Sequence, residues 1–148
     1  TPAQFGPIKV ILSDLEYLKV PVIKKNCSHV FYIFALKIFT SKIGIHRDKI
    51  FDALTAEGIP GLQKKYLNLP RLPIFTKKIA YGSKGFPWNL NSSTKKIKYT
   101  KGICPKADKL FDENYLGILL CSYDFKKKDA LKIIDAFKKV WKNLDLLK

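Results

Sequence analysis

Thiol and imidazole side chains are the first residues in this sequence whose types and spacing suggest chemistry. Cys27 and His29 stand two residues apart, and both side-chain types ligate zinc or act as a nucleophile and its base. A closed zinc site needs four ligands, and the remaining soft ligands, His46, Cys104 and Cys121, have no paired spacing. The pattern therefore predicts no metal site, and it distinguishes no cysteine as a nucleophile.

These residues have simpler structural roles. We expect His29 to pack, or to form a hydrogen bond, at the end of a strand, and His46 to cap the N-terminus of a helix. Cys104 and Cys121 are expected to act as small apolar residues in or beside buried elements. Three cysteines without C-x-x-C spacing also argue against a secreted disulfide framework.

Other catalytic motifs do not occur in the chain. It contains no G-x-S-x-G, no glycine-rich phosphate loop and no H-E-x-x-H. The adjacent acids Asp112 and Glu113 are interpreted as a solvated helix end rather than as general acids. The sequence therefore predicts no catalytic residue within these 148 positions.

A proline-rich elbow, residues 66–75, is the best candidate for a binding site. Pro70 and Pro73 bracket Arg71 and Leu72, which favours extended geometry for the residues before each proline and makes the loop stiff. Tyr66 follows an extended run and could present its phenol as a hydrogen-bond donor at the rim of a pocket. A half-buried tyrosine that packs on a sheet explains the same pattern, and both interpretations stay open.

Alternating periodicities predict the elements that position this elbow. The aromatic and β-branched run 29–38 is typical of a strand covered on both faces. From His46 the period changes, with Ile50, Phe51 and Leu54 on one helical face and Arg47, Asp48 and Asp52 on the polar face. Gly58 and Pro60 end this helix.

The second half of the chain repeats the order of strand and helix. A short strand is expected at 59–66, a loop excursion at 84–99 and a helix at 105–114 that begins at Pro105. A further strand is expected at 115–123, with Gly117 where another backbone approaches. Asp124 is expected to cap a long final helix, whose apolar stripe comprises Ala130, Ile133, Ile134, Phe137, Val140, Trp141 and Leu144.

This order predicts an α+β fold. We expect a small antiparallel or mixed sheet of three to four strands, with helices mainly on one face, preceded by a lead-in segment over residues 1–25. At 148 residues the chain fits one core. It begins at Thr1 and contains no methionine, which favours a piece of a longer protein.

The net charge of +16 suggests a partner with phosphate groups, either RNA or an anionic membrane. Only Arg47 and Arg71 are arginines, however, whereas base readout and bidentate phosphate contacts favour that side chain over lysine. The lysines are scattered, and Phe31, Phe34, Phe51 and Trp141 fall on core stripes rather than on a stacking platform. A standalone basic binding module is therefore the alternative, and the first expectation is no nucleic acid and no membrane.

No apolar run reaches the length of a bilayer span, and the first residues lack the order of a signal peptide. A cytoplasmic location is the expectation that follows.

Several segments, in order, resemble the C-terminal part of the DegT/DnrJ/StrS family of pyridoxal-phosphate-dependent sugar aminotransferases. The resemblance runs from about Tyr17 to Leu144. Its carriers are HVFYIF, HRDKIFDALTAEGIP (similar to the family's R-x-x-x-x-x-x-L-x-x-x-G-I), KKYLNLPRLPIF, GICPKADKLFDENYLGILL and DALKIIDAFKKVWKNL. It implies that residues 26–148 are the small domain of a fold-type I aminotransferase whose large, cofactor-binding domain is absent from this chain.

The resemblance also implies an activity and its partners. The enzyme would move an amino group from glutamate or glutamine to a keto group of a nucleotide-linked sugar, as a homodimer. Pyridoxal phosphate, the cofactor, would supply the electron sink, and the lysine that forms its Schiff base belongs to the absent domain. No lysine here is given that role, and the absent domain is expected to cover an apolar face larger than about 600 Å².

The family pattern places a wall of the substrate site at the elbow. Tyr66 matches the tyrosine that opens the family's Y-x-x-x-H segment, and Pro70 stands where the histidine is expected. Phe75 replaces a common tyrosine, and Asp108 replaces a glutamate. The resemblance thus implies substrate contacts at Tyr66, Pro70 and Arg71, without the imidazole.

Overall fold

The computed structural model describes residues 6–148, which fall into two units. The first, called the sheet unit, comprises the described residues up to Lys65 together with Glu113–Lys148. The second, called the insert, is Tyr66–Asp112. The single domain expected for residues 26–148 is therefore divided by an internal segment, and each unit is described by itself.

The sheet unit contains an antiparallel sheet of four strands in the order β1-β2-β4-β3. The strands are β1 (Leu18–Lys19), β2 (Phe34–Ile38), β3 (Leu62–Gln63) and β4 (Tyr115–Ile118). β2 pairs with β4 in the register Phe34 to Ile118, and β3 pairs with the other edge of β4. The α+β class with a small antiparallel sheet, expected from the sequence, is confirmed.

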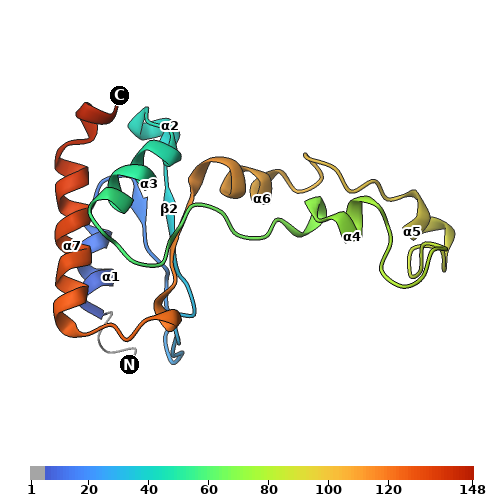
Figure 1. Cartoon of the computed structure of the whole chain (residues 1–148), viewed down its shortest axis with the longest axis horizontal. Helices are drawn as coiled ribbons and strands as arrows, with labels where there is room; N and C mark the ends of the chain where they lie inside the picture. Colours follow the sequence, from blue (N-terminus) through green and yellow to red (C-terminus); the bar gives the residue numbers. More distant parts are fainter. Residues whose placement is uncertain (1–5) are drawn as a thin grey trace. The chain divides into compact units, whose positions relative to one another are not determined.

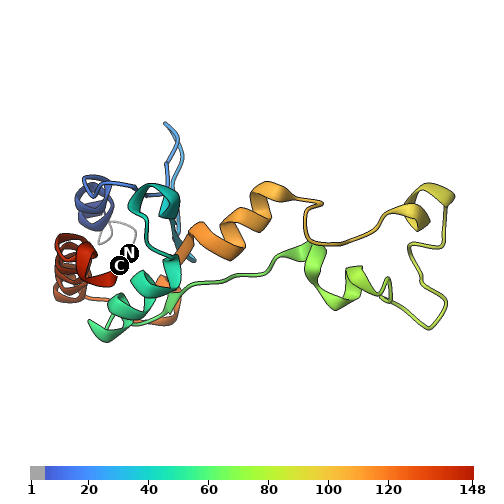
Figure 2. The ribbon, with the colours of Figure 1, turned by 90° about the horizontal axis from the view of Figure 1, so that it is seen from above.

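Helices of the sheet unit are α1 (Gly6–Ser13), α2 (Thr40–Ile43), α3 (Arg47–Ala56) and α7 (Lys127–Lys142), with short turns at Leu120–Ser122 and Leu144–Leu147. Figures 1 and 2 show α1 and α7 side by side on one face of the sheet. The α7 stripe buries Ala130, Ile133, Ile134, Ala136, Phe137 and Val140, so the long amphipathic helix is confirmed. Its cap is Lys126, not Asp124, because the Asp129 carboxylate accepts the Lys126 N–H at 2.9 Å.

The lead-in segment contributes to this unit. Ile8 and Leu12 of α1 and Leu18 of β1 are buried in the common core. The lead-in's first five residues lie outside the described part of the chain. An N-terminal segment thus supplies one helix and an edge strand to the sheet.

The strand expected at 29–38 differs in two ways from the structure. Phe31 has a positive φ of 49°, which breaks extended geometry, and β2 begins only at Phe34. Burial alternates along β2, with Ala35 exposed between two buried neighbours, so only one face is covered. The interpretation as a strand covered on both faces was wrong.

The expected strands at 59–66 and 115–123 are shorter than the sequence indicates. Gly61, with φ of 65°, precedes the two-residue β3, and β4 ends at Ile118. At Gly117 a side chain, rather than another backbone, makes the close approach. A Cβ there would lie 2.2 Å from the Tyr115 hydroxyl, so only glycine leaves room for that ring.

Helix α3 is bounded as the sequence predicts, but one of its faces is not. His46 caps it by accepting the Asp48 N–H at 3.2 Å, and Gly58 follows its end with φ of 82°. Arg47, expected on the polar face, is fully buried. Its Nε donates to Asp48 at 2.7 Å, and its Nη1 donates to the Tyr115 carbonyl at 3.0 Å.

The expectation that Cys104 and Cys121 pack as small apolar residues was wrong, because both side chains are exposed. Cys27, Cys104 and Cys121 are free thiols and all three are exposed. His29 forms a hydrogen bond as expected, since its Nδ1 accepts the Phe31 N–H at 2.8 Å, but it precedes β2 by five residues and does not lie at a strand end. The core aromatics Phe31 and Phe34 are buried, as the sequence indicates.

Candidate functional site

The insert contains the elbow and its partners. Its elements are a 3₁₀ turn, Leu69–Arg71, then α4 (Pro73–Thr76), α5 (Ser92–Lys96) and α6 (Pro105–Lys109), followed by a π-helical turn, Leu110–Asn114, that runs into β4. The expected helix at 105–114 is thus two helical segments. The loop excursion at 84–99 contains a short helix that Asn91 caps by accepting the Thr94 N–H at 2.8 Å.

The elbow contains backbone hydrogen bonds around its prolines. Arg71 N donates to Asn68 O at 2.9 Å, and Leu72 N donates to Leu69 O at 3.0 Å. Leu72 is extended, as Pro73 requires, whereas Leu69 begins the 3₁₀ turn instead of staying extended. The elbow is thus a hydrogen-bonded turn with Pro70 inside it.

Arg71 is held by two carboxylates of its own unit. Its two terminal nitrogens donate to both oxygens of Asp112 at 2.9 Å, and one of them also contacts the Asp108 carboxylate. The guanidinium lies 5.2 Å from the centre of the Phe111 ring. The hydrogen bonds that Arg71 donates to Asp112, and then to Asp108, hold the pKa of Arg71 above its ordinary value. The bidentate geometry is the one that arginine, but not lysine, can make.

Asp108 sits at the centre of this polar cluster. The carboxylate is buried and accepts the Gly102 N–H at 2.6 Å and the Asn68 amide at 2.9 Å. The Gly102 hydrogen bond first, and then Arg71 and Asn68, hold the pKa of Asp108 below its usual range against the opposing effect of burial. The pKa of Asp112 is likewise lowered, by Arg71 and then by Lys101, whose Nζ lies 2.9 Å away.

Two buried atoms of the cluster lack a partner within the described residues. They are the Arg71 Nε, a donor, and the Asn68 Oδ1, an acceptor. Buried polar atoms are normally paired, so the cluster has capacity for one more donor and one more acceptor. The terminal guanidinium nitrogens, in contrast, are already engaged by carboxylates, which compete with any anionic ligand.

Tyr66 and Pro70, near Arg71 in sequence, are accessible to solvent. Tyr66 is 48% exposed, and its phenol forms no hydrogen bond with any residue from 6 to 148. Pro70 is half-buried and offers only apolar surface and a carbonyl. Of the three residues that the resemblance assigns to substrate, Tyr66 thus presents a free hydroxyl, Pro70 shapes the loop, and Arg71 is engaged in internal ion pairs.

An aromatic cluster elsewhere in the insert was not anticipated. The Phe75 ring lies 5.9 Å from Trp88 and 5.4 Å from Tyr99, and the Trp88 indole donates to the Tyr99 hydroxyl at 3.1 Å. Trp88 is buried. Phe75 therefore packs on aromatic neighbours.

The rarity of arginine in the sequence was the feature that could have indicated the two buried ion-pair clusters. The chain has 28 basic side chains and only two are arginines, and both form ion pairs with aspartate at or near the protein interior. In a lysine-rich chain, a retained arginine indicates a site that needs a planar, bidentate donor. Asn68 carries no comparable signal.

The lysines of the described residues are exposed or partly exposed. No lysine from Lys9 onward is buried, whereas a lysine that bonds to this cofactor lies within an enclosed site. Residues 6–148 also contain no group of three or more potential metal ligands. No step of a reaction is therefore assigned to a lysine of this chain.

The chain was compared with protein-family models and with curated proteins, and neither comparison found a match. Within the described part, no helix combines the length and the apolar character needed to cross a bilayer.

Proposed function

We propose that this chain is the C-terminal part of a pyridoxal-phosphate-dependent aminotransferase that acts on a nucleotide-linked sugar. The amino group would come from glutamate or glutamine, and the full protein would be a cytoplasmic homodimer. The ordered sequence segments motivate the proposal, and the α+β class is compatible with it. This chain supplies a wall of the substrate site and no catalytic residue.

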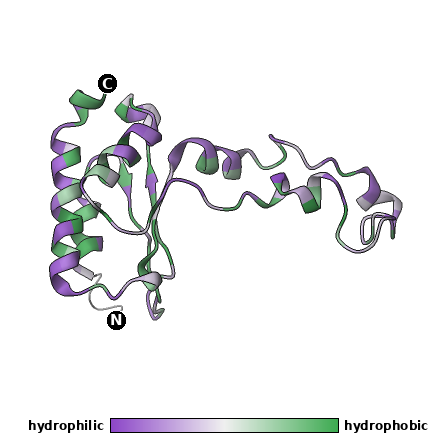
Figure 3. Cartoon of the chain, in the orientation of Figure 1, coloured by the Kyte–Doolittle hydropathy of each residue, from purple (hydrophilic) through white to green (hydrophobic). Residues whose placement is uncertain are grey.

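The observation that carries the proposal is the surface of the insert. Many of its large apolar side chains are exposed, namely Tyr66, Leu67, Leu69, Ile74, Ile79, Tyr81, Phe86, Leu90, Ile97, Ile103 and Leu110. Figure 3 marks hydrophobic positions in green along this segment as well as along the sheet unit. Exposed apolar side chains in this number are typical of an interface, and a further domain or subunit of the enzyme is the proposed cover.

Three residues of the elbow have different roles in the proposed substrate site. Tyr66 donates its free hydroxyl to the substrate, and Pro70 forms apolar wall where the family has an imidazole. Arg71 was assigned to the substrate as well, but its ion pairs with Asp108 and Asp112 suit a positioning residue that holds the turn. Its contact with substrate stays a prediction.

The test requires the longer coding sequence that contains this chain. Amino transfer from glutamate or glutamine to a keto nucleotide sugar is measured for the full protein and for its Tyr66→Phe variant. Loss of one neutral hydrogen bond to substrate should raise KM by about two- to tenfold. Tyr81→Phe, at an exposed tyrosine of the same unit, is the matched control and should leave KM unchanged.

Two results would contradict the proposal. One is a full protein without amino-transfer activity toward any keto sugar nucleotide. The other is a covalent complex of pyridoxal phosphate with the 148-residue chain alone that is lost when one of its own lysines is replaced.

A basic binding module remains the second candidate, because one observation favours it. The insert has nine lysines and Arg71 against two acids, Asp108 and Asp112, and both acids are paired within the cluster. Apart from Lys101, its lysines thus form no ion pair with an acid of the described residues. If the affinity of the isolated chain for RNA or anionic vesicles falls steeply with log salt, the basic module is favoured. Binding that is insensitive to salt, or absent at low ionic strength, would exclude it.

A further inference from the structure

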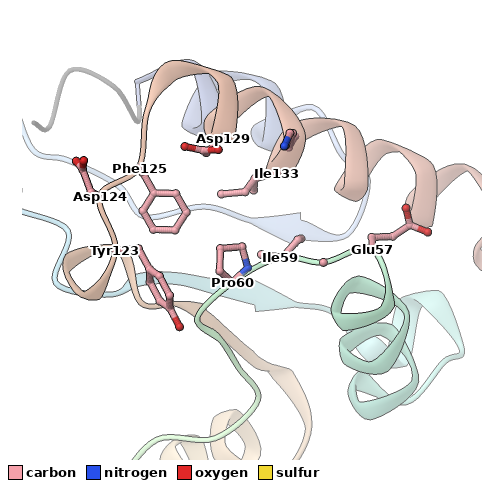
Figure 4. Close-up of a pocket in the computed structure, with 10 residues that line it drawn as sticks. Glu57, Ile59, Pro60, Tyr123, Asp124, Phe125, Asp129 and Ile133 are labelled. Carbon is pink, nitrogen blue, oxygen red and sulfur yellow. The ribbon is translucent and has the colours of Figure 1, made fainter.

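A cavity of about 430 Å³ lies within the sheet unit, and none of the residues that line it belongs to the elbow. The loop Glu57–Pro60 forms one side, and the segment from Tyr123 to Ile133, which begins α7, forms the other (Figure 4). A volume of this size is in the range of small-molecule sites. The sugar aminotransferase proposal assigns no role to it.

One wall of the cavity is apolar and contains two aromatic rings. Tyr123 and Phe125 are in edge contact, with 5.6 Å between ring centres, and Pro60 faces the two rings (Figure 4). Tyr123 can lie there because residue 61 is glycine, since a Cβ at Gly61 would come within 2.7 Å of the ring. Ile133 adds aliphatic surface from α7. This wall suits an aromatic or aliphatic side chain of a ligand.

Two opposite charges on α7 line the same cavity without pairing with each other. Asp129 and Lys132 are three residues apart, so they are neighbours on one face of the helix. The Asp129 carboxylate accepts only the Lys126 N–H, and Lys132 forms no ion pair or hydrogen bond with described residues. An unpaired carboxylate and an unpaired ammonium therefore stand about one helical turn apart beside an apolar wall.

The rim of the cavity carries further charges of both signs. Glu57 is neutralised by Lys139, whose Nζ lies 2.8 Å from its carboxylate. Asp124 is exposed and without an ionic partner, which adds negative charge, and the N-terminus of α7 adds partial positive charge. A singly charged ligand would be attracted by one of Asp129 and Lys132 and repelled by the other, whereas a zwitterion is attracted by both.

We propose that this cavity binds a free α-amino acid with an apolar side chain. Its ammonium pairs with Asp129, its carboxylate pairs with Lys132 at the positive end of α7, and its side chain packs on Tyr123, Phe125 and Pro60. The ammonium and carboxylate of an amino acid share one carbon, which suits groups on adjacent turns of a helix. This site is independent of the elbow.

The test is an NMR titration of the full 148-residue chain with four probes. L-Phenylalanine carries all three recognised groups, and a dissociation constant of about 1 mM is expected for a ligand of its size. 2-Phenylethylammonium lacks the carboxylate, 3-phenylpropionate lacks the ammonium, and glycine lacks the side chain. Each of these should bind at least about threefold more weakly, with amide shifts confined to 57–61 and 123–133 in the case of L-phenylalanine.

Matched variants assign each charge. Asp129→Asn, which keeps an acceptor for the Lys126 N–H, should weaken L-phenylalanine by about two- to fivefold and leave 3-phenylpropionate unchanged. Lys132→Gln should weaken L-phenylalanine by a similar factor and leave 2-phenylethylammonium unchanged or tighter. Asp135→Asn and Lys138→Gln, at exposed α7 positions outside the cavity, are controls that should change nothing.

Three results would overturn the proposal. They are the absence of localised shifts with L-phenylalanine at about 10 mM, equal affinity for the probe that lacks one charged group, and equal effects of the control variants. None of these results depends on amino-transfer activity, so failure here is distinct from failure of the proposed enzyme function.

Discussion

The sheet unit buries a continuous apolar core, whereas the insert buries one tryptophan and a cluster of charged and amide groups. Phe34, Phe137 and their neighbours are shielded by helices on one face of the sheet. In the insert, Asn68 and Asp108 are buried while most large apolar side chains face outward. Apolar burial thus stabilises the sheet unit, whereas ion pairs and hydrogen bonds order the insert.

This difference has a physical consequence for independent stability. Burial of apolar area is the dominant favourable contribution to folding, at about 25 cal/mol per Å². Ion pairs and hydrogen bonds mainly replace interactions with water, so they fix geometry more than they stabilise. The sheet unit should therefore unfold cooperatively, and the insert should gain its full order when its apolar surface is covered.

The largest expected effect comes from a core truncation. Phe137→Ala removes a fully buried ring from the centre of α7 and should lower the free energy of unfolding by about 3–5 kcal/mol. Leu90→Ala in the insert removes a side chain that is 69% exposed and should change it by less than about 0.5 kcal/mol. Urea unfolding followed by far-UV circular dichroism measures both. Similar losses for the two variants would mean that the insert has a core of its own.

The two arginines give a smaller effect that sharpens the comparison. Arg47→Met removes the donor to the Tyr115 carbonyl and should cost about 2 kcal/mol, since the exposed side of Asp48 can return to water. Arg71→Met should leave the urea midpoint of the sheet unit unchanged. Instead, amide hydrogen exchange should accelerate by about tenfold or more between Asn68 and Asp108, where the bidentate pair is lost. A shift of the urea midpoint by Arg71→Met would contradict the separation of the two units.

Local periodicity was sufficient for most of the sheet unit. The α7 stripe, the start of α3 at His46 and its end at Gly58 follow from spacing and capping rules, because each depends on residues within a few positions. Strand ends were less accurate, since positive φ at Phe31 and the pairing of β4 depend on contacts distant in sequence.

The polar clusters could not be predicted in this way. Arg47 pairs with a carbonyl 68 positions away, and Arg71 pairs with an aspartate 41 positions away. A helical wheel places Arg47 on the polar face, because periodicity carries no information about a partner brought by another strand. The cavity beside α7 was missed for the same reason, although the elbow itself was recognised from its prolines.

The smallest expected effect is an acid transition confined to the insert. Asp108 and Asp112 have folded pKa values below those of free carboxyls, so their contribution is complete above pH of about 4, near the unfolded pKa, and is lost as pH falls through the folded values. In a Trp141→Phe background, fluorescence of the buried Trp88 should therefore change between about pH 4 and 2. An Asp112→Asn variant, which cannot form the bidentate ion pair, should show part of that change already at neutral pH. A Trp88 signal that is the same in both proteins down to pH 2 would mean that the aromatic cluster, rather than the ion pairs, holds the insert together.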